Sequence, residues 1–411
     1  MTSFHVRTWP VALDRPLVEL LDDHAGTAWL QGDRGLVGIG EAARLDVGAG
    51  DDRFRRAREW FGALTRDATV DDPVEVPGSG LVALASFGFD DRSHGSVVIV
   101  PEIVAGRIDE TTFVTRIGVE PLPEDPPTLE PEVVSTDPVD RPRYAGSSLP
   151  DVSWLEAVAT ALEQIETGRV DKVVLARDHA LWSKVAFSPR RLAGRLQGRF
   201  PGCYTFVVDG FVGATPELLV SRFGRDVASR VLAGSAPRGG DENEDDALAT
   251  ALRSSDKDRW EHELALRTVR DAIAPHCESL DIEDEPHLLR LANVMHLGTW
   301  CRGALPADAP SALDLAADLH PTAAVGGVPT DVAVELIREL EHMDRGRYAG
   351  PVGWMDGSGD GEFGVALRCA QLSGARARLF AGAGIVEGSL PEDELEETRV
   401  KLLAMQSAFA P

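Results

Sequence analysis

The amino-acid sequence predicts an α+β fold that is built on extended, mainly antiparallel sheets. Runs typical of strands are numerous along the 411 residues, whereas runs typical of helices are few and long. Strands and helices also do not alternate in the strict order that a parallel α/β sheet requires. No internal repeat is visible along the chain.

The first third of the chain predicts one helix and two strand regions. Residues 51–67 (DDRFRRAREWFGALTRD) have a helical pattern, and residues 81–91 and 96–107 have strand patterns joined by the turn-like sequence DRSHG. Residues 121–150 then hold 8 of the 26 prolines, and this much proline rules out a helix or a central strand. We expect this stretch to be a connector, or an edge segment that crosses between two halves of the molecule.

The pattern is clearer after this proline-rich stretch. Residues 153–168 predict an amphipathic helix, with Ser153 and Glu156 spaced as a capping box and Gly168 at its end. Further helices are predicted at 256–274 and at 391–409, where Pro391 stands at the start. Strands are predicted at 171–182, at 203–224 as two strands around a turn, and at 348–356, 362–374 and 377–389 as successive antiparallel strands.

The composition limits the functions that are open to this chain. With 43% hydrophobic and 26% charged residues it is an ordinary globular chain, and no run approaches the ~18–20 apolar residues of a membrane span. The net charge of −26 repels nucleic acid and anionic membrane surfaces, or reflects life in high salt. The four cysteines form no CxxC pair and no export signal is visible, so we expect reduced, mostly buried thiols in a cytoplasm.

Lysine is scarce in this sequence. Of 41 basic residues only four are lysines, namely Lys172, Lys184, Lys257 and Lys401. A lysine supplies a compact ammonium, or a proton near neutral pH, which the guanidinium of arginine cannot. These lysines are therefore candidates for a specific role, although a bias toward arginine codons would leave the same count.

Two predicted helices carry acid pairs at helical spacing. Asp258 and Glu261 lie three residues apart, as do Glu394 and Glu397, and Lys401 follows Glu397 by four, so each set shares one helix face. Such pairs often form no more than a solvated helix face. If the two faces meet, they form an all-oxygen cage, which suits Mg²⁺. A zinc site is not expected, because the histidines lack metal-ligand spacing.

Two further residues are candidates for acid–base chemistry. Lys172 alternates with Val174 and Ala176 on one face of a strand, where it is either an edge lysine in water or a desolvated amine. Desolvation lowers the pKa of a lysine from ~10.4 toward neutrality, which makes the amine a usable base. Glu217 follows a proline, where it is either a turn carboxylate or a carboxylic acid that is kept protonated in a dry site.

Other candidates rest on weaker patterns. Arg368 lies between apolar strand residues, and a buried arginine usually has a carboxylate partner in the protein or in a ligand. Gly234 and Ser235 form a tight turn with available N–H groups. His296 is as well explained by a hydrogen-bonded core histidine as by a ligand contact.

Taken in order, the motifs resemble those of the chorismate-utilising enzymes, which include anthranilate, aminodeoxychorismate, salicylate and isochorismate synthases. The resemblance covers about residues 150–411 and rests on ten ordered motifs: KVVLAR, GATPELL, LAGSAPRG, KDRWEHE, VMHLGT, HPTAAVGGVP, YAGPVGW, ALRCA, FAGAGIVEGS and ELEETRVK. KVVLAR and HPTAAVGGVP resemble the isochorismate synthases within this family. Anthranilate synthases usually lack a lysine at the position of Lys172, and salicylate synthases tend to carry threonine at that of Ala324. Ala236 departs from the pattern, because many relatives have a larger residue there.

The resemblance implies a role for each matching residue. Lys172 would be the base that activates water for attack at ring C2 of chorismate, and Glu217 the acid that protonates the departing C4 hydroxyl. Glu261 and Glu397 would bind Mg²⁺, with Asp258 and Glu394 helping through water, and the metal would hold the ring carboxylate. The residues implied to contact or border the substrate are Gly234, Ser235, His296, Ala324, Tyr348, Arg368, Gly382 and Lys401.

The resemblance also implies an organisation for the whole molecule. Large, mainly antiparallel sheets with helices packed outside would form an α/β sandwich-like fold. Residues 1–148 would be a divergent N-terminal portion that ends in the proline-rich connector, and residues 149–411 the chorismate-binding catalytic region of one compact unit. The enzyme would be a monomer that needs no glutaminase subunit, and its product would feed menaquinone, siderophore or salicylate synthesis. Alternatives are a salicylate or anthranilate synthase, a non-catalytic relative and an unrelated carboxylate–metal hydrolase.

Overall fold

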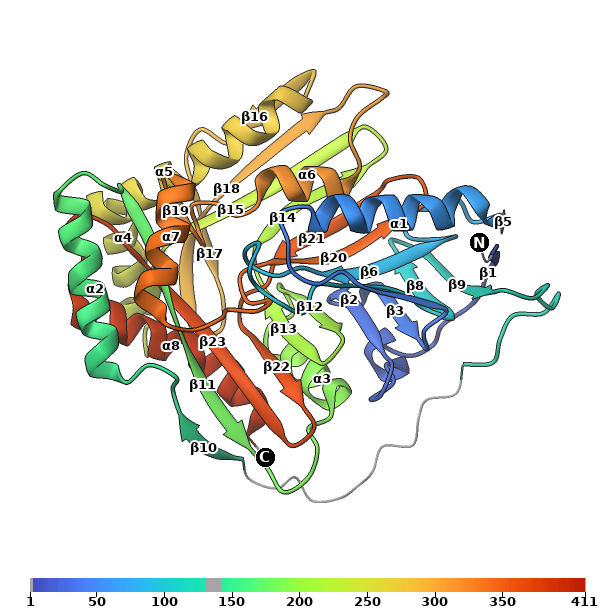
Figure 1. The fold of residues 1–411 in the computed structure, drawn as a ribbon, viewed down its shortest axis with the longest axis horizontal. Helices are drawn as coiled ribbons and strands as arrows, with labels where there is room; N and C mark the ends of the chain where they lie inside the picture. Colours follow the sequence, from blue (N-terminus) through green and yellow to red (C-terminus); the bar gives the residue numbers. More distant parts are fainter. Residues whose placement is uncertain (1–2, 130–141, 411) are drawn as a thin grey trace.

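The computed structural model describes residues 3–129 and 142–410, and it confirms the predicted α+β fold (Figure 1). Within these residues the strands form one sheet of 13 and one of 10. Neighbouring strands of this described part pair antiparallel, except that β1 (His5–Pro10) and β5 (Thr69–Asp71) pair parallel. Both sheets contain strands from before and after the proline-rich stretch.

The larger sheet runs, in spatial order, through β10 (Arg143–Gly146), β11 (Lys172–Trp182), β23 (Arg376–Ile385), β22 (Cys369–Ser373), β13 (Phe211–Thr215), β12 (Tyr204–Val208), β2 (Thr27–Gln31), β3 (Arg34–Ile39), β8 (Ile103–Ile108), β9 (Thr111–Gly118), β1 and β5, with β19 (Gly327–Val328) paired to β11. The smaller sheet runs through β16 (Ser279–Ile282), β18 (Val294–Ala304), β15 (Asp226–Pro237), β14 (Leu218–Phe223), β21 (Gly361–Val365), β20 (Pro351–Asp356), β6 (Val82–Ser86), β7 (Val97–Val100) and β4 (Ala43–Asp46), with β17 (His287–Arg290) paired to β18.

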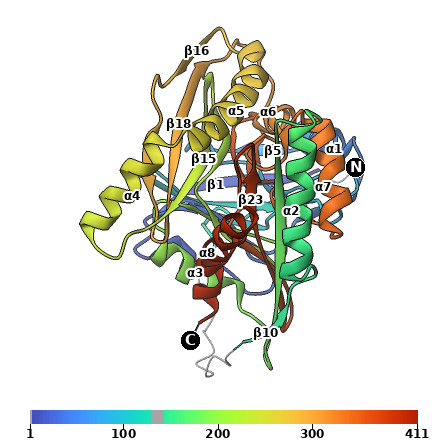
Figure 2. The ribbon, with the colours of Figure 1, turned by 90° about the vertical axis from the view of Figure 1, so that its left-hand side faces the viewer.

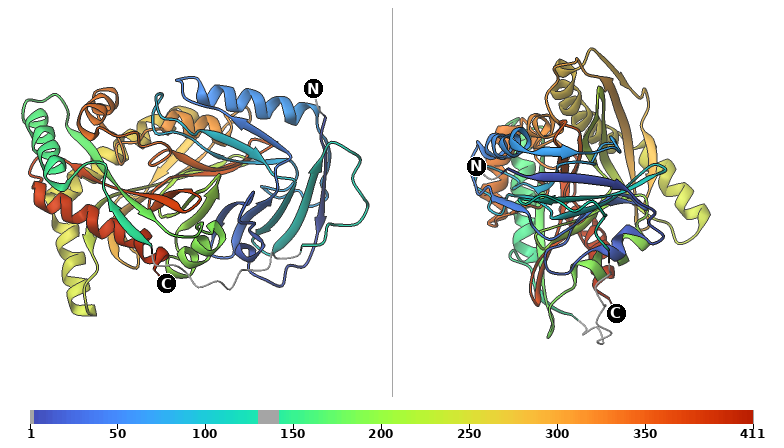
Figure 3. Two further views of the ribbon diagram at one scale, coloured as in Figure 1. Left: turned by 60° about the horizontal axis from the view of Figure 1, so that its bottom comes forward. Right: turned by 90° about the vertical axis from the view of Figure 1, so that its right-hand side faces the viewer.

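Helices cover the outside of these sheets, as predicted (Figures 1 and 3). They are α1 (Arg53–Asp67), α2 (Asp151–Glu166), α3 (Pro189–Arg199), α4 (Glu242–Ser254), α5 (Asp256–Ile273), α6 (Ala312–Leu319), α7 (Thr330–Glu341) and α8 (Pro391–Phe409), with short 3₁₀ turns η1 (Leu17–Leu20) and η2 (Ala274–His276). Helix α8 packs against β23, α5 against β15 and α7 against β11. Figure 2 looks onto the end of the molecule where α2 lies beside both α7 and α8.

Two segments of the chain pass from one sheet to the other at neighbouring points. Residues 203–224, predicted as two strands, form three, because Pro216 and Glu217 separate β13 in the larger sheet from β14 in the smaller one. Residues 362–374, predicted as one strand, break between β21 and β22, where Arg368 has a left-handed φ of 47°. The backbone of Ala214 donates to Arg368 at 3.1 Å, and that of Val365 donates to Glu217 at 3.2 Å, so the two crossings are bonded together.

Most predicted elements are confirmed, and one predicted cap is wrong. The predictions for α1, α5, α8 and β11 agree with the structure within two residues at either end. Helix α2 begins two residues earlier than predicted, behind Pro150, so Ser153 lies inside it and no capping box forms. Gly168, with φ of 72°, follows its end as predicted.

The proline-rich stretch is only partly described. Residues 121–129 contain no regular helix or strand, and residues 143–146 form β10 at the edge of the larger sheet. This position agrees with the predicted edge segment, because an edge strand tolerates proline nearby. The remainder of the predicted connector, residues 130–141, lies outside the described part of the chain.

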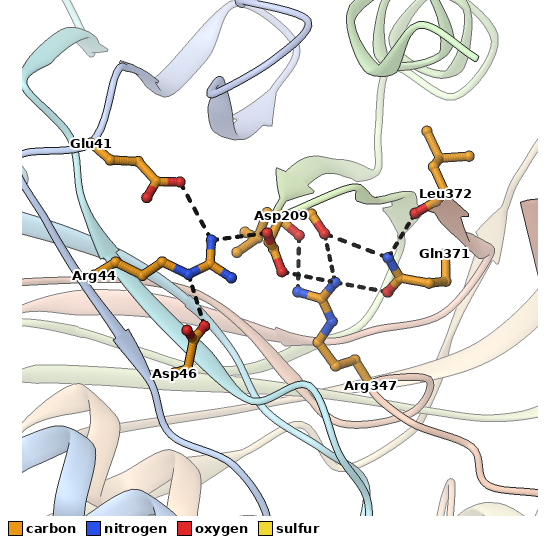
Figure 4. A network of polar contacts seen from close by, with 8 residues as sticks. Glu41, Arg44, Asp46, Asp209, Arg347, Gln371 and Leu372 are labelled. Atoms are coloured by element: carbon orange, nitrogen blue, oxygen red, sulfur yellow. Dashed lines mark hydrogen bonds and ion pairs between the residues drawn. The ribbon is translucent and has the colours of Figure 1, made fainter. Parts of the chain in front are cut away.

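A buried arginine joins distant parts of the fold (Figure 4). Arg347, in the turn before β20, donates to the carbonyl oxygens of Val208 and Asp209 at 3.0 and 2.8 Å and to Gln371 Oε1 at 2.7 Å. Asp209 in turn receives a 2.9 Å hydrogen bond from Arg44 of β4, so the network reaches from the N-terminal third to β22. We define the Arg347 network as the side chains of Arg347, Gln371, Asp209 and Arg44, with those of Glu41 and Asp46 at the rim (Figure 4).

None of the helices in the described residues combines the length and the apolar character needed to cross a membrane.

Candidate active site

A pocket lies where the two strand crossings meet. Its empty volume, counted out to its mouth, is about 640 Å³. The predicted residues that line it are Glu217, Ser235, Glu261, His296, Ala324, Tyr348, Arg368, Gly382 and Lys401. The sequence therefore predicted nine of the nineteen residues that line the pocket, and the roles of these nine stay predictions.

The other predicted residues lie behind this wall. They are Lys172, Gly234, Asp258, Glu394 and Glu397, none of which lines the pocket. Gly234 is the extra residue of a bulge in β15, with φ of 74°, and it turns the chain so that Ser235 reaches the pocket. An added Cβ at Gly234 would come within 3.1 Å of the Asp258 Cβ, so glycine lets β15 and α5 approach each other closely.

Arg368, His296 and Ser235 form a chain of hydrogen bonds at the pocket wall. Burial, helped by the charge of Arg368, lowers the pKa of His296 well below its ordinary value, so the ring is neutral. Arg368 has only donors, so its 2.9 Å contact makes His296 Nε2 the acceptor, and the ring proton sits on Nδ1. Nδ1 lies 3.0 Å from Ser235 Oγ and donates to it, which leaves the serine hydroxyl proton free to point at a ligand.

Glu217 is a buried acid beside several cations. Burial raises its pKa to about 7, although Arg368, Lys172 and Arg230 each act to lower it. Arg230 also donates to the backbone carbonyl of Pro216, which fixes the turn that carries Glu217. A carboxyl group with this pKa is partly protonated at neutral pH, so it can donate a proton to a leaving group.

Lys172 is completely buried, so the alternative of an edge lysine in water is wrong. Its Nζ lies 3.0 Å from Glu261 Oε1, an ion pair whose geometry falls short of a directed hydrogen bond. Gly384 makes room for this pair, because an added Cβ there would stand 2.2 Å from Glu261 Oε1. The amine therefore sits just behind the pocket, next to a glutamate that lines it.

Two more lysine–glutamate pairs lie on the predicted acid faces of α5 and α8, and one of them joins the two helices. Lys257 Nζ donates to Glu394 Oε1 at 2.6 Å, so it joins the two helices, and Lys401 donates to Glu397 one turn before it on α8. Lys401 also donates to the carbonyl oxygen of Gly382 at 3.0 Å, which places its ammonium at the pocket wall. The predicted meeting of the two faces is therefore present.

The donor set of these faces fits a hard divalent cation in its chemistry. Asp258, Glu261, Glu394 and Glu397 offer oxygen atoms only, and Glu397 is close enough to raise the pKa of both Asp258 and Glu394, in each case after burial, the largest cause. Within the described residues, however, no three acid, histidine or cysteine side chains converge as a ligand set. The glutamates point at lysines instead, so metal binding requires them to turn toward a common centre.

Several residues of the pocket were not predicted. They are Val174, Pro216, Leu232, Val325, Arg345, Ala349, Leu367, Phe380, Ala381 and Gly384. Most are apolar residues within the ten motifs, and nothing in their spacing separates them from core residues. Arg345 had no sequence signal either, and the protein already binds its guanidinium, through Glu341 and through the carbonyl oxygens of Val174 and Val325.

Comparisons with known proteins identify the family and the fold of the chain. Residues 127–410 match the model of a family described as "Chorismate binding enzyme". A Mycobacterium tuberculosis protein named MenF is 46% identical over 289 residues, which cover 67% of this chain and 77% of the relative. Isochorismate synthase DhbC of Bacillus subtilis is 42% identical over 267 residues, or 62% of this chain and 67% of the relative. The solved structure of MenF, the menaquinone-specific isochorismate synthase from Escherichia coli, shares the fold with a TM-score of 0.79 at 22% identity, covering 99% of this chain and 94% of that one.

Proposed function

The chain belongs to the family of chorismate-binding enzymes, and from this premise we propose that it is an isochorismate synthase. The reaction moves a hydroxyl group from C4 to C2 of the chorismate ring by way of water. The observation that carries the proposal is the juxtaposition of Glu217, a buried acid with a pKa of about 7, and Lys172, a buried amine whose charge acts on it. The resemblance of the motifs to the isochorismate synthase branch and the name of the Bacillus subtilis relative support it.

In the proposed reaction, the amine of Lys172 takes a proton from a water molecule as the water oxygen bonds to ring C2. The ring double bonds shift and the C4–O bond breaks, while the carboxyl group of Glu217 donates its proton to the departing hydroxyl. One water is consumed and one released, so the product is an isomer of the substrate. The ammonium of Lys172 and the carboxylate of Glu217 then exchange a proton through solvent to restore the starting state.

A chain with a net charge of −26 repels a dianion such as chorismate, and cations at the pocket offset this repulsion locally. We propose that Arg368 and Lys401 bind the carboxylates of chorismate, with Ser235 donating its free hydroxyl proton. Tyr348, His296, Ala324, Gly382 and Gly234 shape the pocket around the ring. The stacked rings of Tyr348 and Phe380, with centroids 5.1 Å apart, support this arrangement because they hold one wall rigid.

We further propose that Glu261 and Glu397 hold a Mg²⁺ ion, with Asp258 and Glu394 contributing through water. The ion would supply positive charge for the ring carboxylate of chorismate. The all-oxygen donor set and the contact between the two acid faces support this proposal. The protein's own part is to present the four carboxylates on two helices that Lys257 already joins.

We propose that residues 1–148 and 149–411 form one structural unit, which acts as a monomer in the cytoplasm without a glutaminase subunit. Both sheets mix strands from the two parts, and the Arg347 network crosses between them. The four cysteines are free thiols, three of them buried, which agrees with a reducing compartment.

The direct test is to incubate purified protein with chorismate and Mg²⁺ and to separate the products by chromatography. Isochorismate is the expected product. Salicylate with pyruvate would assign the chain to the lyase branch, and anthranilate that forms only with ammonia would assign it to the amination branch. Chorismate binding without any product would indicate a non-catalytic relative, and ester or phosphate cleavage would indicate a hydrolase.

The role of Lys172 as the general base can be tested separately. Lys172→Ala is expected to reduce turnover by about 10²–10⁴-fold or more, since it removes the general base, while Mg²⁺ still binds. Lys184→Ala is the matched control, because Lys184 is an exposed lysine in the bend after β11. Full activity of the Lys172 variant would remove this residue from the mechanism.

A further inference from the structure

Three of the four lysines face the acid cluster of α5 and α8. Lys172 pairs with Glu261, Lys257 with Glu394 and Lys401 with Glu397. In a chain that otherwise uses arginine, this distribution is specific. When all groups are ionised, the four carboxylates and three ammonium groups leave one negative charge, so the cluster is almost neutral without a metal ion.

The three ammonium groups differ in their freedom to move. The side chain of Lys172 has no exposed surface, and that of Lys401 is held by both Glu397 and the carbonyl oxygen of Gly382. Lys257 lies in the first turn of α5 with its side chain 33% exposed, whereas its partner Glu394 is 2% exposed. Lys257 alone of this trio can swing into water without a large desolvation change.

We propose that Lys257 is a mobile counter-ion of the metal site, which neutralises Glu394 while the metal is absent and leaves it when Mg²⁺ binds. This inference rests on the proposed function, because it takes Mg²⁺ to be the ion bound by these acids. The proposal gives Lys257 a positioning role. Until Mg²⁺ binds, its ammonium supplies the positive charge next to Glu394 and keeps α5 and α8 together.

The charges of the cluster explain why the exchange is favourable. The side chain of Glu394 is 2% exposed, and a buried carboxylate needs a cation beside it, which Lys257 supplies at 2.6 Å. A Mg²⁺ ion that Glu394 helps to hold would supply positive charge to the same carboxylate that Lys257 contacts at 2.6 Å. Two cations that share one carboxylate repel each other, and the repulsion is strong where little water screens it, so bound Mg²⁺ favours the release of Lys257 into water.

Amine labelling can follow this movement directly. The protein is acetylated briefly with and without saturating Mg²⁺, and the modification of each lysine is measured by peptide mass spectrometry. We expect Mg²⁺ to raise the labelling of Lys257 about three- to tenfold, because the released ammonium gains exposure, while labelling of the exposed Lys184 is unchanged. Labelling of Lys257 that stays the same or falls when Mg²⁺ is added would overturn the proposal.

Calorimetric titration with Mg²⁺ alone gives a second test. Lys257→Met removes the competing cation, so we expect it to bind Mg²⁺ about three- to tenfold more tightly than the natural protein, as the loss of one partly exposed ion pair implies. Arg259→Met is the matched control, because it removes a positive charge two residues further along α5 from a side chain that is 55% exposed and pairs with Glu285. An equal gain in both variants, an unchanged or weaker affinity, or no binding by any of the three proteins would overturn the proposal.

A product assay on the natural protein separates this inference from the proposed function. If isochorismate forms from chorismate but Lys257 neither changes its labelling nor affects Mg²⁺ affinity, the counter-ion proposal fails while the function stands. If Mg²⁺ releases Lys257 but no isochorismate forms, the function fails while the counter-ion proposal stands.

Discussion

Arg347 and Arg368 are both almost fully buried, but their guanidinium groups have very different surroundings. Arg347 donates to two carbonyl oxygens and a side-chain amide, and Asp209 lies 3.9 Å away as a counter-charge. Arg368 donates to His296 and lines the pocket, while its buried Nε finds no partner in the described part of the chain. Burial lowers the pKa of both groups, that of Arg347 to about 10.

This difference separates a structural arginine from a binding one. Arg347 donates to acceptors of the protein itself and so joins the β12–β13 segment to β22. Its hydrogen bonds therefore stabilise the fold. Arg368 stands in a left-handed backbone conformation, which costs about 1–3 kcal/mol, and its buried Nε donor has no partner within the described residues although the side chain lines the pocket. A buried donor without a partner, on a residue with a strained backbone, indicates that a ligand supplies the missing acceptor.

The largest effect on stability is expected from Arg347→Met. The replacement leaves the carbonyl oxygens of Val208 and Asp209 buried without this donor, so we expect the apparent free energy of unfolding to fall by about 3–5 kcal/mol. The loss is measured by thermal and urea unfolding. Activity well below the melting temperature should fall less than about tenfold, because Arg347 does not line the pocket. A variant as stable as the natural protein would show that the network contributes nothing.

The same replacement at Arg368 is expected to have the opposite profile. Arg368→Met removes a charged donor from the pocket, so kcat/KM for chorismate should fall by about 10²–10³-fold. The apparent stability should change by no more than about 1 kcal/mol, because an incompletely paired buried cation adds little to it. Steady-state kinetics and melting curves of the two methionine variants together give the comparison its sharpest test. If both variants lose stability alike, the distinction between the two arginines is wrong.

Much of this site follows from sequence, but the difference between the two arginines does not. The motif around Arg368 predicted a buried arginine with a ligand or protein partner. Lys172 was found from the alternation of its strand, Glu217 from its place after a proline, and the acid pairs from helical spacing. Arg347 carried no such signal, because its partners lie 138, 139 and 24 residues away along the chain. The break between β21 and β22 was missed for the same reason, since only the pairing of both crossings explains it.

The pH dependence of Glu217→Gln tests the dry character of the pocket. The pKa of Glu217 is about 7 in the folded protein against an ordinary 4.5, so folding favours its protonated form. Its contribution to stability is therefore complete below about pH 4.5 and is lost as pH rises through 7. The difference between these two pKa values corresponds to roughly 3 kcal/mol.

Glutamine keeps the shape of the neutral acid and does not titrate. The stability of Glu217→Gln relative to the natural protein should therefore rise by up to about 3 kcal/mol between pH 5 and pH 8. Melting curves of both proteins at several pH values measure this difference, in which the other titrating groups largely cancel. A difference that is constant with pH would mean that Glu217 is ionised in the folded protein, and it could not then serve as the acid.

The smallest effect is expected at the rim of the Arg347 network, with Arg44→Gln. Its hydrogen bond to Asp209 raises the pKa of Arg44 further above its usual range, yet the side chain is 31% exposed and its partner Asp46 is 76% exposed. Water and salt replace such contacts readily, so the apparent stability should fall by about 1 kcal/mol or less, and by less still in 1 M salt. Unfolding at low and high salt measures both values. A loss as large as that of Arg347→Met would show that the network acts as one cooperative unit, in which Arg44 orients Asp209 for Arg347, and burial alone would not then determine how much each arginine contributes.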